Sequence, residues 1–446
     1  MGIRLTYRQL AKRVKRQKRN IILLLCSAAI VGVGIGVVDA ILQAPDDDKT
    51  PKGSIPEEFL DVYPSGDKRI LRGFASGVTL DKLSKYSVLY IYGDITDIQH
   101  NAFDQIAHPG DIRHDIPDSI DNISFSPYTD LGYNIEQYAF RGSWSLDHFK
   151  YFNHVNSIGD YAFAYCSNIV NVPEFDSDLI SIGKGAFEGC ARMSGELTVN
   201  NTIASIGESA FEGCESLTGT LSVSSLIQSI PRRAFYDCVS ISDVEMYEGS
   251  NLLHIGDEAF EGCENLESFD LSVLESLEDI GYESFAGCTK LTEVNIDGLN
   301  LLSEIGDSAF EGCTALEDVN FGGNNMLWSL GESCFKDCTS LQYLDTQDTY
   351  ISVFNDNCFS GCTSIAGTFI FPQSTQTIGS NVLLGSTVDQ LWFKTISPIP
   401  TIKIDSLPYD QLLSDGGIIV PRGEIDDYTE SSEIWLSYIS KMMQAD

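Results

Sequence analysis

Apolar and polar positions recur along this chain with a period of 24 or 25 residues. The segment IGDSAFEGCTALEDVNF at residues 305–321 has near copies that begin at Ile255, Ile280 and Leu330. In each copy an apolar residue lies five positions before a phenylalanine, and a cysteine lies three positions after it. This cysteine occurs in nine consecutive copies, from Cys166 to Cys362. A repeat of this length and regularity predicts a solenoid, in which each copy is one coil of a stack.

Each copy has two halves with different hydrophobic patterns. The first half, Ile-Gly-x-x-Ala-Phe-x-Gly-Cys-x-x-Leu, places apolar residues at helical offsets between glycines, which predicts a short helical or 3₁₀ turn. The second half alternates, as in Leu291-Thr-Glu-Val294-Asn-Ile296, which predicts a short strand with one buried face. We therefore predict a β-rich solenoid, a leucine-rich repeat array of about 10–12 coils, with parallel strands on one face and short turns on the other.

The core of each predicted coil contains the phenylalanine and the cysteine. We expect the cysteines to be buried free thiols that pack as small apolar residues. Disulfides between coils are the alternative, but parallel side chains in register hold their Cβ atoms too far apart for good geometry. The predicted core residues are Phe163, Cys166, Phe187, Cys190, Phe211, Cys214, Phe235, Cys238, Phe260, Cys263, Phe285, Cys288, Phe310, Cys313, Phe335, Cys338, Phe359 and Cys362.

Charge and hydropathy set the N-terminus apart from the repeats. The first 20 residues carry eight basic residues and no acid, whereas the rest carries 20 basic and 64 acidic residues, a net charge of −44. Residues 21–38 are apolar and as a helix would just span a bilayer core. This asymmetry predicts a membrane anchor with the repeats outside the cytoplasm. A signal peptide cleaved after Ala40 is the alternative and would make the protein secreted. Gly32 and Gly36 share one helix face and could dimerise the anchor.

The pattern divides the chain into six parts. We predict a basic cytoplasmic tail (1–20), a transmembrane helix (21–38), a flexible linker (39–56), an N-terminal cap with degenerate repeats (57–134), the solenoid (135–389) and a C-terminal cap (390–446).

The residues of the chain suggest no catalytic chemistry. Three of the six histidines, His100, His108 and His114, fall in the N-terminal cap without a metal-ligand spacing. Nearly every repeat supplies an acid, so that carboxylate pairs are expected without any catalytic purpose. We predict no enzyme, no cofactor and no metal site. Nucleic acid is disfavoured as a partner, because its phosphates would be repelled by the net charge of −44.

The solvent side of the predicted strands is the candidate partner-binding face. Acids, asparagines and one tyrosine occupy it in successive copies, and like charges at strand spacing repel one another. Three interpretations remain open: solubility alone, a concave face for a partner, and weak binding of divalent cations. The candidate residues are Asp243, Glu245, Asp270, Glu293, Asn295, Asp318, Asn320, Tyr343 and Asp345.

The repeat resembles the BspA-type leucine-rich repeats of bacterial surface proteins. The resemblance is close over residues 135–390 and weak over 88–134, and residues 418–439 are similar to the segment that often closes such arrays. It implies adhesion to host or neighbouring-cell proteins. The first hypothesis is therefore an anchored recognition protein with a protein or glycan partner. The second is a structural or assembly component of an envelope or virus particle, since a fold does not dictate what its surface binds.

Overall fold

The computed structural model describes residues 51–445, except for residues 53, 66–67, 93–94, 108–113, 115, 127–131, 153, 323–325, 404, 411 and 414–415. The chain divides into two units, Met1–Pro51 and Lys52–Asp446. The predicted tail, the predicted membrane helix with Gly32 and Gly36, and nearly all of the predicted linker lie outside the described residues. Among the residues that are described, no helix has the length and apolar character needed to cross a bilayer.

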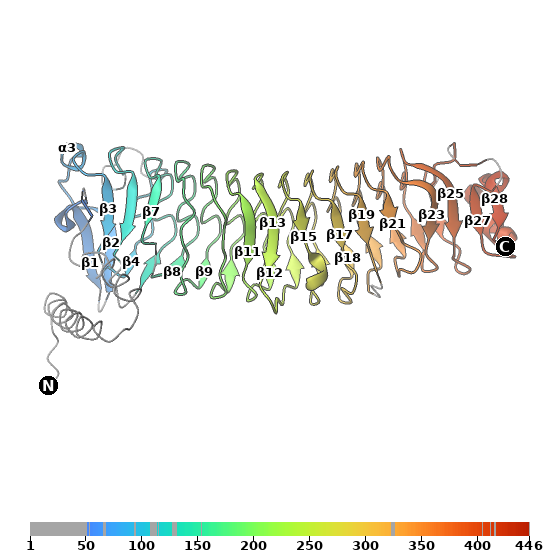
Figure 1. The fold of residues 1–446 in the computed structure, drawn as a ribbon, viewed down its shortest axis with the longest axis horizontal. Coiled ribbons are helices and arrows are strands. Elements are labelled where there is room, and N and C mark those ends of the chain that lie inside the picture. The colour runs from blue at the N-terminus through green and yellow to red at the C-terminus, as the bar shows by residue number, and fades with distance from the viewer. Residues whose placement is uncertain are drawn as a thin grey trace, which may run out of the picture. The chain divides into compact units, whose positions relative to one another are not determined.

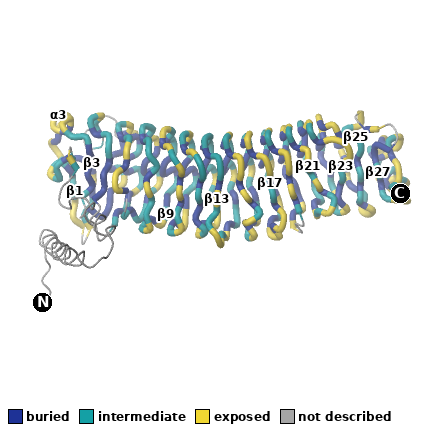
Figure 2. Tube along the Cα trace, in the orientation of Figure 1, coloured by how far each residue is buried: buried dark blue, intermediate teal, exposed yellow. Residues whose placement is uncertain are grey.

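The unit of residues 52–446 is an elongated stack of coils that runs from the first strands to the C-terminal helices (Figure 1). Except for the antiparallel pair β1 and β2, neighbouring strands in each ladder come from successive coils and are parallel, for example Ile255 opposite Ile280 and Ile280 opposite Ile305. Buried residues alternate with exposed ones along the trace of each coil (Figure 2). The predicted solenoid of stacked parallel coils is confirmed.

One side of the stack is formed by the Ile-Gly segments, which are very short strands. The N-terminal sheet contains β1 (Leu60–Ser65), β2 (Lys68–Phe74), β4 (Asp97–Ile98), β6 (Tyr133–Ile135), β8 (Val155–Ile158), β9 (Ser181–Ile182) and β10 (Ser205–Ile206). The second sheet contains β12 (Ser229–Ile230), β14 (His254–Ile255), β16 (Asp279–Ile280), β18 (Glu304–Ile305), β20 (Ser329–Leu330), β22 (Val353–Phe354), β24 (Thr377–Ile378) and β26 (Thr401–Ile402).

The prediction of a helical or 3₁₀ turn for the Ile-Gly segment was wrong, because bonds between coils decide its conformation. The N–H of Gly281 donates to the carbonyl of Ile255 in the preceding coil at 2.8 Å. The two coils approach so closely that a Cβ on Gly281 would lie 2.7 Å from the backbone nitrogen of Asp257. The glycine is therefore a consequence of packing between coils, and not the end of a helix.

The Ala-Phe segment that follows is a row of turns rather than a helix. Around Phe310, the residues Ser308 and Gly312 have positive φ angles of 53° and 74°, which a right-handed helix excludes. The N–H groups of Ser308, Phe310 and Gly312 donate to carbonyls of the next coil at 2.7–2.8 Å. This segment therefore forms another hydrogen-bonded side of the coil.

The alternating half of the repeat forms the predicted parallel strands, but in short separate sheets. These are β3 (Val88–Ile91), β5 (Asn122–Phe125) and β7 (His148–Lys150); β11 (Gly219–Val223), β13 (Ile241–Met246) and β15 (Ser268–Phe269); β17 (Glu293–Asn295), β19 (Asp318–Asn320) and β21 (Tyr343–Leu344); and β23 (Ala366–Phe371), β25 (Thr387–Phe393), β27 (Ile418–Val420) and β28 (Met442–Gln444). The 3₁₀ turn η3 (Leu271–Val273) follows β15, where one sheet ends before the next begins.

Pro231 marks the boundary between the two ladders on the Ile-Gly side. In other coils the residue after the strand donates its N–H to the preceding coil, as Gly207 and Gly256 do at 2.8 Å. Proline has no N–H to donate. On the opposite half of the same two coils, β11 and β13 pair along the whole of Gly219–Val223. The backbone hydrogen bond that Pro231 cannot donate on the Ile-Gly side therefore coincides with a long ladder, β11 and β13, on the opposite side.

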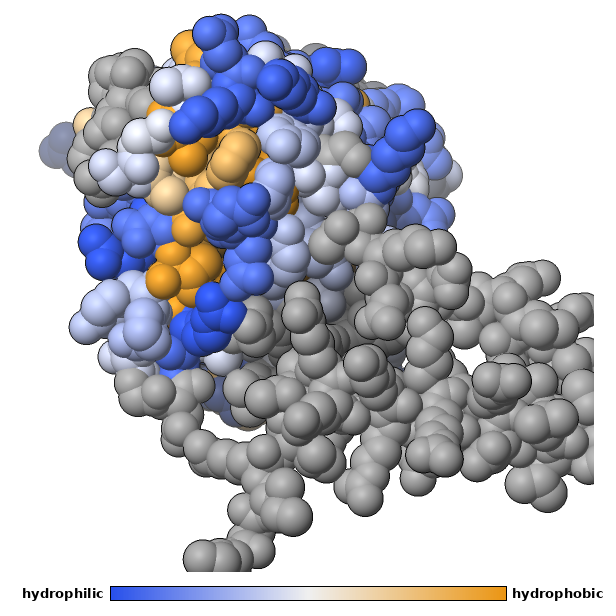
Figure 3. Space-filling model, turned by 90° about the vertical axis from the view of Figure 1, so that its left-hand side faces the viewer, coloured by the Kyte–Doolittle hydropathy of each residue, from blue (hydrophilic) through white to orange (hydrophobic). Residues whose placement is uncertain are grey.

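Both ends of the stack have their own closing elements. At the N-terminus, η2 (Glu57–Phe59), the antiparallel hairpin of β1 and β2, and α3 (Leu80–Leu83) precede the first regular coils. A view onto this end shows a narrow apolar strip between hydrophilic residues (Figure 3). At the C-terminus lie α4 (Ile425–Ser431), α5 (Glu433–Ser437) and η4 (Ile439–Lys441). Trp435 is buried there, 5.2 Å from the ring of Phe393, and its indole N–H donates to the carbonyl of Pro400 at 2.8 Å.

Candidate binding face

The core residues lie in two buried columns that hold the face in place. The phenylalanine rings of neighbouring coils stack, as Phe285 and Phe310 do with 5.2 Å between ring centroids. All eleven cysteines in the described part of the chain are buried and free. Burial raises the pKa of the Cys313 thiol to about 12, so that these groups are neutral at physiological pH.

The cysteines have a second role that sequence reasoning missed. Cys313 donates its S–H to the carbonyl of Phe285 in the preceding coil at 3.3 Å, and the same bond recurs from Cys166 to Cys362. In an earlier coil Ser143 takes the same position after its phenylalanine and donates to the carbonyl of Phe103 at 3.2 Å. A small residue with a donor satisfies a buried carbonyl that a purely apolar residue would leave without a partner.

Six of the nine candidate residues belong to the coils of β17, β19 and β21. Glu293, Asp318 and Tyr343 are paired in register across the three strands, and all three are exposed. Between them and the next row, Val294 and Val319 are buried. This alternation anchors the sheet to the core through every second side chain and presents the others to solvent.

The row formed by Asn295, Asn320 and Asp345 has a structural role as well as contact with solvent. Each side-chain Oδ1 accepts the N–H of the residue two positions later, at 2.9–3.2 Å. Asn320 also donates to Oδ1 of Asn295 at 3.0 Å. These residues stabilise the turns that end the strands. We therefore expect them to contribute less to partner binding than the row of Glu293, Asp318 and Tyr343.

An open hollow lies where β21 ends this small sheet. It has a volume of about 320 Å³ and is lined by Asp318, Val319, Asn320, Gln342, Tyr343, Leu344 and Asp345. Tyr343, which lines this hollow, is 63% exposed. The hollow forms because β21 has only two residues, whereas the next strand on this side, β23, has six and pairs with β25 instead. Four of the predicted residues thus line one concave surface.

Of the three remaining candidates, two lie on a different sheet and the third lies directly after its last strand. Asp243 is on β13 and accepts a hydrogen bond from Ser268 at 2.5 Å, and Glu245 is exposed on the same strand. Asp270 caps η3, where its Oδ1 accepts the N–H of Ser272 at 3.0 Å. The break at η3 separates this sheet from the one that contains Tyr343. The structure therefore does not join all nine residues into one continuous surface.

The candidate acids in the three coils of β17, β19 and β21 are available to a partner. Among the ion pairs of the described residues, none involves Glu293, Asp318 or Asp345. An exposed aromatic ring beside carboxylates without ionic partners suits lysine or arginine side chains, which can contact both. This arrangement can bind, but it contains no nucleophile paired with a base.

A second group of exposed residues is apolar and occupies one position of consecutive coils. Leu301, Met326 and Tyr350 lie four residues before the end of β18, β20 and β22, in consecutive coils, and each is about half exposed. Trp328, two positions after Met326, is exposed to a similar extent. The available signal was the presence of apolar residues at a position of the repeat where other coils carry Thr202 or Ser374.

The comparisons with known proteins concern the repeat. The sequence model of the BspA type leucine rich repeat region matches in six copies, over residues 133–267, 194–302 and 279–402. The matched ranges together span 133–402, or 270 of the 446 residues. A search of curated proteins finds no match.

Several solved structures are similar to this one. A leucine-rich repeat protein from Bacteroides ovatus ATCC 8483 has a TM-score of 0.56 and 19% identity over 88% of this chain and 100% of that chain. One from Eubacterium ventriosum ATCC 27560 has a TM-score of 0.40 and 17% identity over 74% and 85%. A leucine rich cell surface protein from Faecalibacterium prausnitzii A2-165 has a TM-score of 0.39 and 16% identity over 76% and 94%. The first of these likenesses shows a common fold.

The period of 24 or 25 residues, the parallel coils and the matched span of residues 133–402 lead to one conclusion. The chain belongs to the family of proteins with BspA-type leucine-rich repeats.

Proposed function

We propose that this chain is an extracytoplasmic recognition protein that binds a protein partner through the sheet of β17, β19 and β21. The observation that carries the proposal is the 63% exposed Tyr343 beside Asp318 on a rigid sheet, at the edge of a hollow of about 320 Å³. Aromatic residues in such positions supply much of the binding energy in protein interfaces.

The charge of the face defines the chemistry of the partner. Beyond the first 20 residues the chain carries 64 acids against 20 bases. The contact surface of the partner is therefore basic, because a surface of opposite charge is attracted over long range and one of like charge is repelled. Its lysine or arginine side chains contact the ring of Tyr343 and the carboxylates of Asp318 and Asp345.

Membrane attachment is part of the proposal. Residues 21–38 anchor the protein, residues 1–20 remain in the cytoplasm near anionic lipids, and the repeats lie outside. Gly32 and Gly36 bring two anchors together. Mass spectrometry of the N-terminus, after expression in a host with a membrane insertion pathway, tests this. Retention of residues 1–40 supports the anchor, and their loss shows secretion.

Binding through the face is tested on the full-length protein by surface plasmon resonance against purified cell-surface and matrix proteins. For a partner that docks here, Tyr343→Ala reduces the affinity at least about tenfold, and Asp318→Asn reduces it and weakens its salt dependence. Thr198→Ala, an exposed position on a different part of the stack, is the matched control.

Three results would contradict the proposal. The first is a partner that binds Tyr343→Ala and Asp318→Asn as tightly as the unchanged protein. The second is a defined oligomer in light scattering with no binding across the panel, which would favour an assembly role. A glycan that binds where no protein does would also exclude a protein partner.

A further inference from the structure

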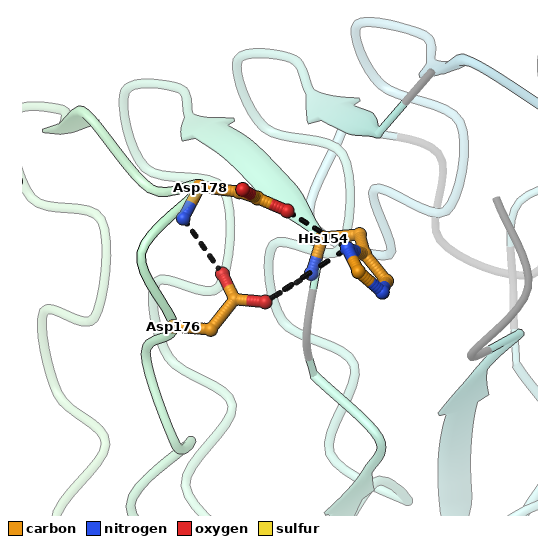
Figure 4. Close-up of side chains that lie close together, drawn as sticks. All are labelled: His154, Asp176 and Asp178. Carbon is orange, nitrogen blue, oxygen red and sulfur yellow. Dashed lines mark hydrogen bonds and ion pairs between the residues drawn. The ribbon is translucent and has the colours of Figure 1, made fainter. Parts of the chain in front are cut away.

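His154, Asp176 and Asp178 converge at one point on the surface of the stack, away from the strand face. They come from two consecutive coils, His154 next to the start of β8 and the two aspartates before β9, and their side chains point toward one another (Figure 4). One ligand atom of each lies within 4.8 Å of the others. The Nδ1 atom of His154 is 2.7 Å from Oδ2 of Asp178 and 4.0 Å from Oδ2 of Asp176.

The group is held in place by hydrogen bonds from three neighbouring coils. The N–H of His154 donates to Oδ2 of Asp176 at 2.8 Å, and its carbonyl accepts the N–H of Tyr133 at 2.7 Å. The N–H of Asp178 donates to Oδ1 of Asp176 at 3.0 Å. On the other side, the amide of Asn200 donates to the carbonyl of Asp176 at 3.0 Å. The ligand atoms are therefore positioned before any ion arrives, which lowers the entropic cost of binding.

The structural requirements of the coil do not explain why one histidine and two aspartates occupy these positions. The position of Asp176 requires only an acceptor for a turn, and Asn200 and Ser224 meet this need in the next two coils. The position shared by His154 and Asp178 lies four residues before the end of the strand. The eight coils that follow fill it with neutral residues, namely Thr202, Leu226, Asn251, Ser276, Leu301, Met326, Tyr350 and Ser374. A histidine and two carboxylates thus meet at positions where the fold does not require these residue types.

We propose that His154, Asp176 and Asp178 bind one divalent transition-metal ion of the zinc class. Imidazole and carboxylate are both ligands of zinc, and the two negative charges match the charge of the ion. Calcium and magnesium fit less well, because they prefer oxygen ligands alone. The three side chains are 32%, 30% and 43% exposed, so that the ion can enter and water can occupy the remaining coordination position. The ion would join two consecutive coils.

A simple ion pair between histidine and aspartate is the competing explanation, and the chain offers a matched control for it. His254 and Asp279 also come from consecutive coils, with 2.5 Å between Nδ1 and Oδ2. In the part of the chain that the structure describes, only the group at His154 brings a third ligand within reach. Binding of the ion should therefore depend on His154 and not on His254.

The test is equilibrium dialysis of the full-length protein, without an affinity tag, against zinc chloride at neutral pH, with the bound metal quantified. We expect one equivalent per chain with micromolar affinity. Asp176→Asn keeps the turn, as Asn200 does, and Asp178→Thr copies Thr202. Each should weaken binding at least about tenfold, whereas His254→Gln should leave it unchanged. Zinc should also raise the melting temperature of the unchanged protein and not that of Asp176→Asn.

Three outcomes would overturn the proposal: no bound zinc up to millimolar concentration, equal binding by Asp176→Asn, or an equal loss in His254→Gln. Zinc held by cysteines would appear as binding that neither aspartate variant affects, and this also counts against the site. If Asp178→Thr does not fold, Asp176→Asn still decides the question, since its turn is preserved. Partner binding at Tyr343 is measured separately, and neither result depends on the other.

Discussion

Single residues in this stack are influenced most by their counterparts one coil away. Glu261 illustrates this, because it follows Phe260 on the outside of its coil. Partial burial, then the charges of Glu283 and Glu258, raise its pKa from 4.5 to about 7, while Arg233 opposes the shift. The ionised form of Glu261 is thus less favourable in the folded protein than in the unfolded chain.

This raised pKa predicts the effect of Glu261→Gln at different pH values. Between about 4.5 and 7 the folded state binds more protons than the unfolded state, so stability falls as pH rises through this window. Above this pH window the destabilisation caused by ionised Glu261 is fully present, and below the window it is absent. Glu261→Gln should therefore raise the melting temperature at pH ~8 by on the order of 1 °C, because solvent screening keeps the effect small, and by less at pH ~5.

Thermal unfolding followed by circular dichroism measures this difference, with Glu275→Gln as an exposed control. A variant that melts below the unchanged protein at the higher pH would show that Glu261 is stabilising in its charged form.

At the level of residues, spacing predicted some positions and not others. The columns of phenylalanine and cysteine follow from counting 24 or 25 residues, because every coil buries the same positions. The bond from Cys313 to the carbonyl of Phe285 needs the backbone geometry between coils, which no spacing contains. The group at His154 was missed for a similar reason. Asp178 lies one period after His154, whereas the spacings that indicate a metal site place the ligands within one local loop.

At the level of elements, contacts between coils override local hydrophobic patterns. The alternating half of the repeat gave strands as predicted, since alternation and strand pairing demand the same side-chain directions. The Ile-Gly half fits a helix by spacing, yet Ile280 lies in a strand and pairs with Ile255 and Ile305. Its glycine is required because the backbone of the preceding coil lies so close. In the sequence, a glycine required by such packing looks the same as a glycine that ends a helix.

Gly281→Ala tests the importance of this approach. The added Cβ would meet the backbone of Asp257 and Gly256 at 2.7 Å, and neither backbone can move without disturbing its own coil. We expect a loss of about 1–3 kcal/mol in the free energy of unfolding, as for other overpacked sites. Chemical denaturation measures it. Gly298→Asn is the control, because Gly298 has a φ of 80° with open space around it and asparagine tolerates this conformation. Equal stability of both variants would mean that the coils can separate at no cost.

For the whole molecule, each coil is supported mainly by its two neighbours and the ends by their caps. In such arrays stability is a sum of coil and interface contributions, so that damage at one end stays near that end. The C-terminal cap buries Trp435 against Phe393, and the hairpin of β1 and β2 stands at the other terminus. The loss of the repeat predicts caps at both ends, but the elements found there were not predictable, since each end has its own irregular sequence.

Trp435→Ala should therefore have a local effect. Removal of a buried tryptophan costs about 3–5 kcal/mol, and this cost falls on the contacts among β25, α4 and α5. Hydrogen exchange followed by mass spectrometry should show faster exchange in these elements and unchanged exchange in β8, β9 and β10. A uniform increase along the whole chain would instead indicate that the stack unfolds as a single block.

The boundary at Pro231 has a mechanical consequence. Where the ladder on the Ile-Gly side stops between β10 and β12, the ladder of β11 and β13 spans the same two coils. Where the other side stops after β15 and after β21, the pairs β14–β16 and β20–β22 span the interruption. The ladders on the two sides are thus interrupted between different pairs of coils. A force that pulls on a bound partner is therefore carried across each interruption by an intact ladder of hydrogen bonds on the opposite side. The stack does not separate at Pro231.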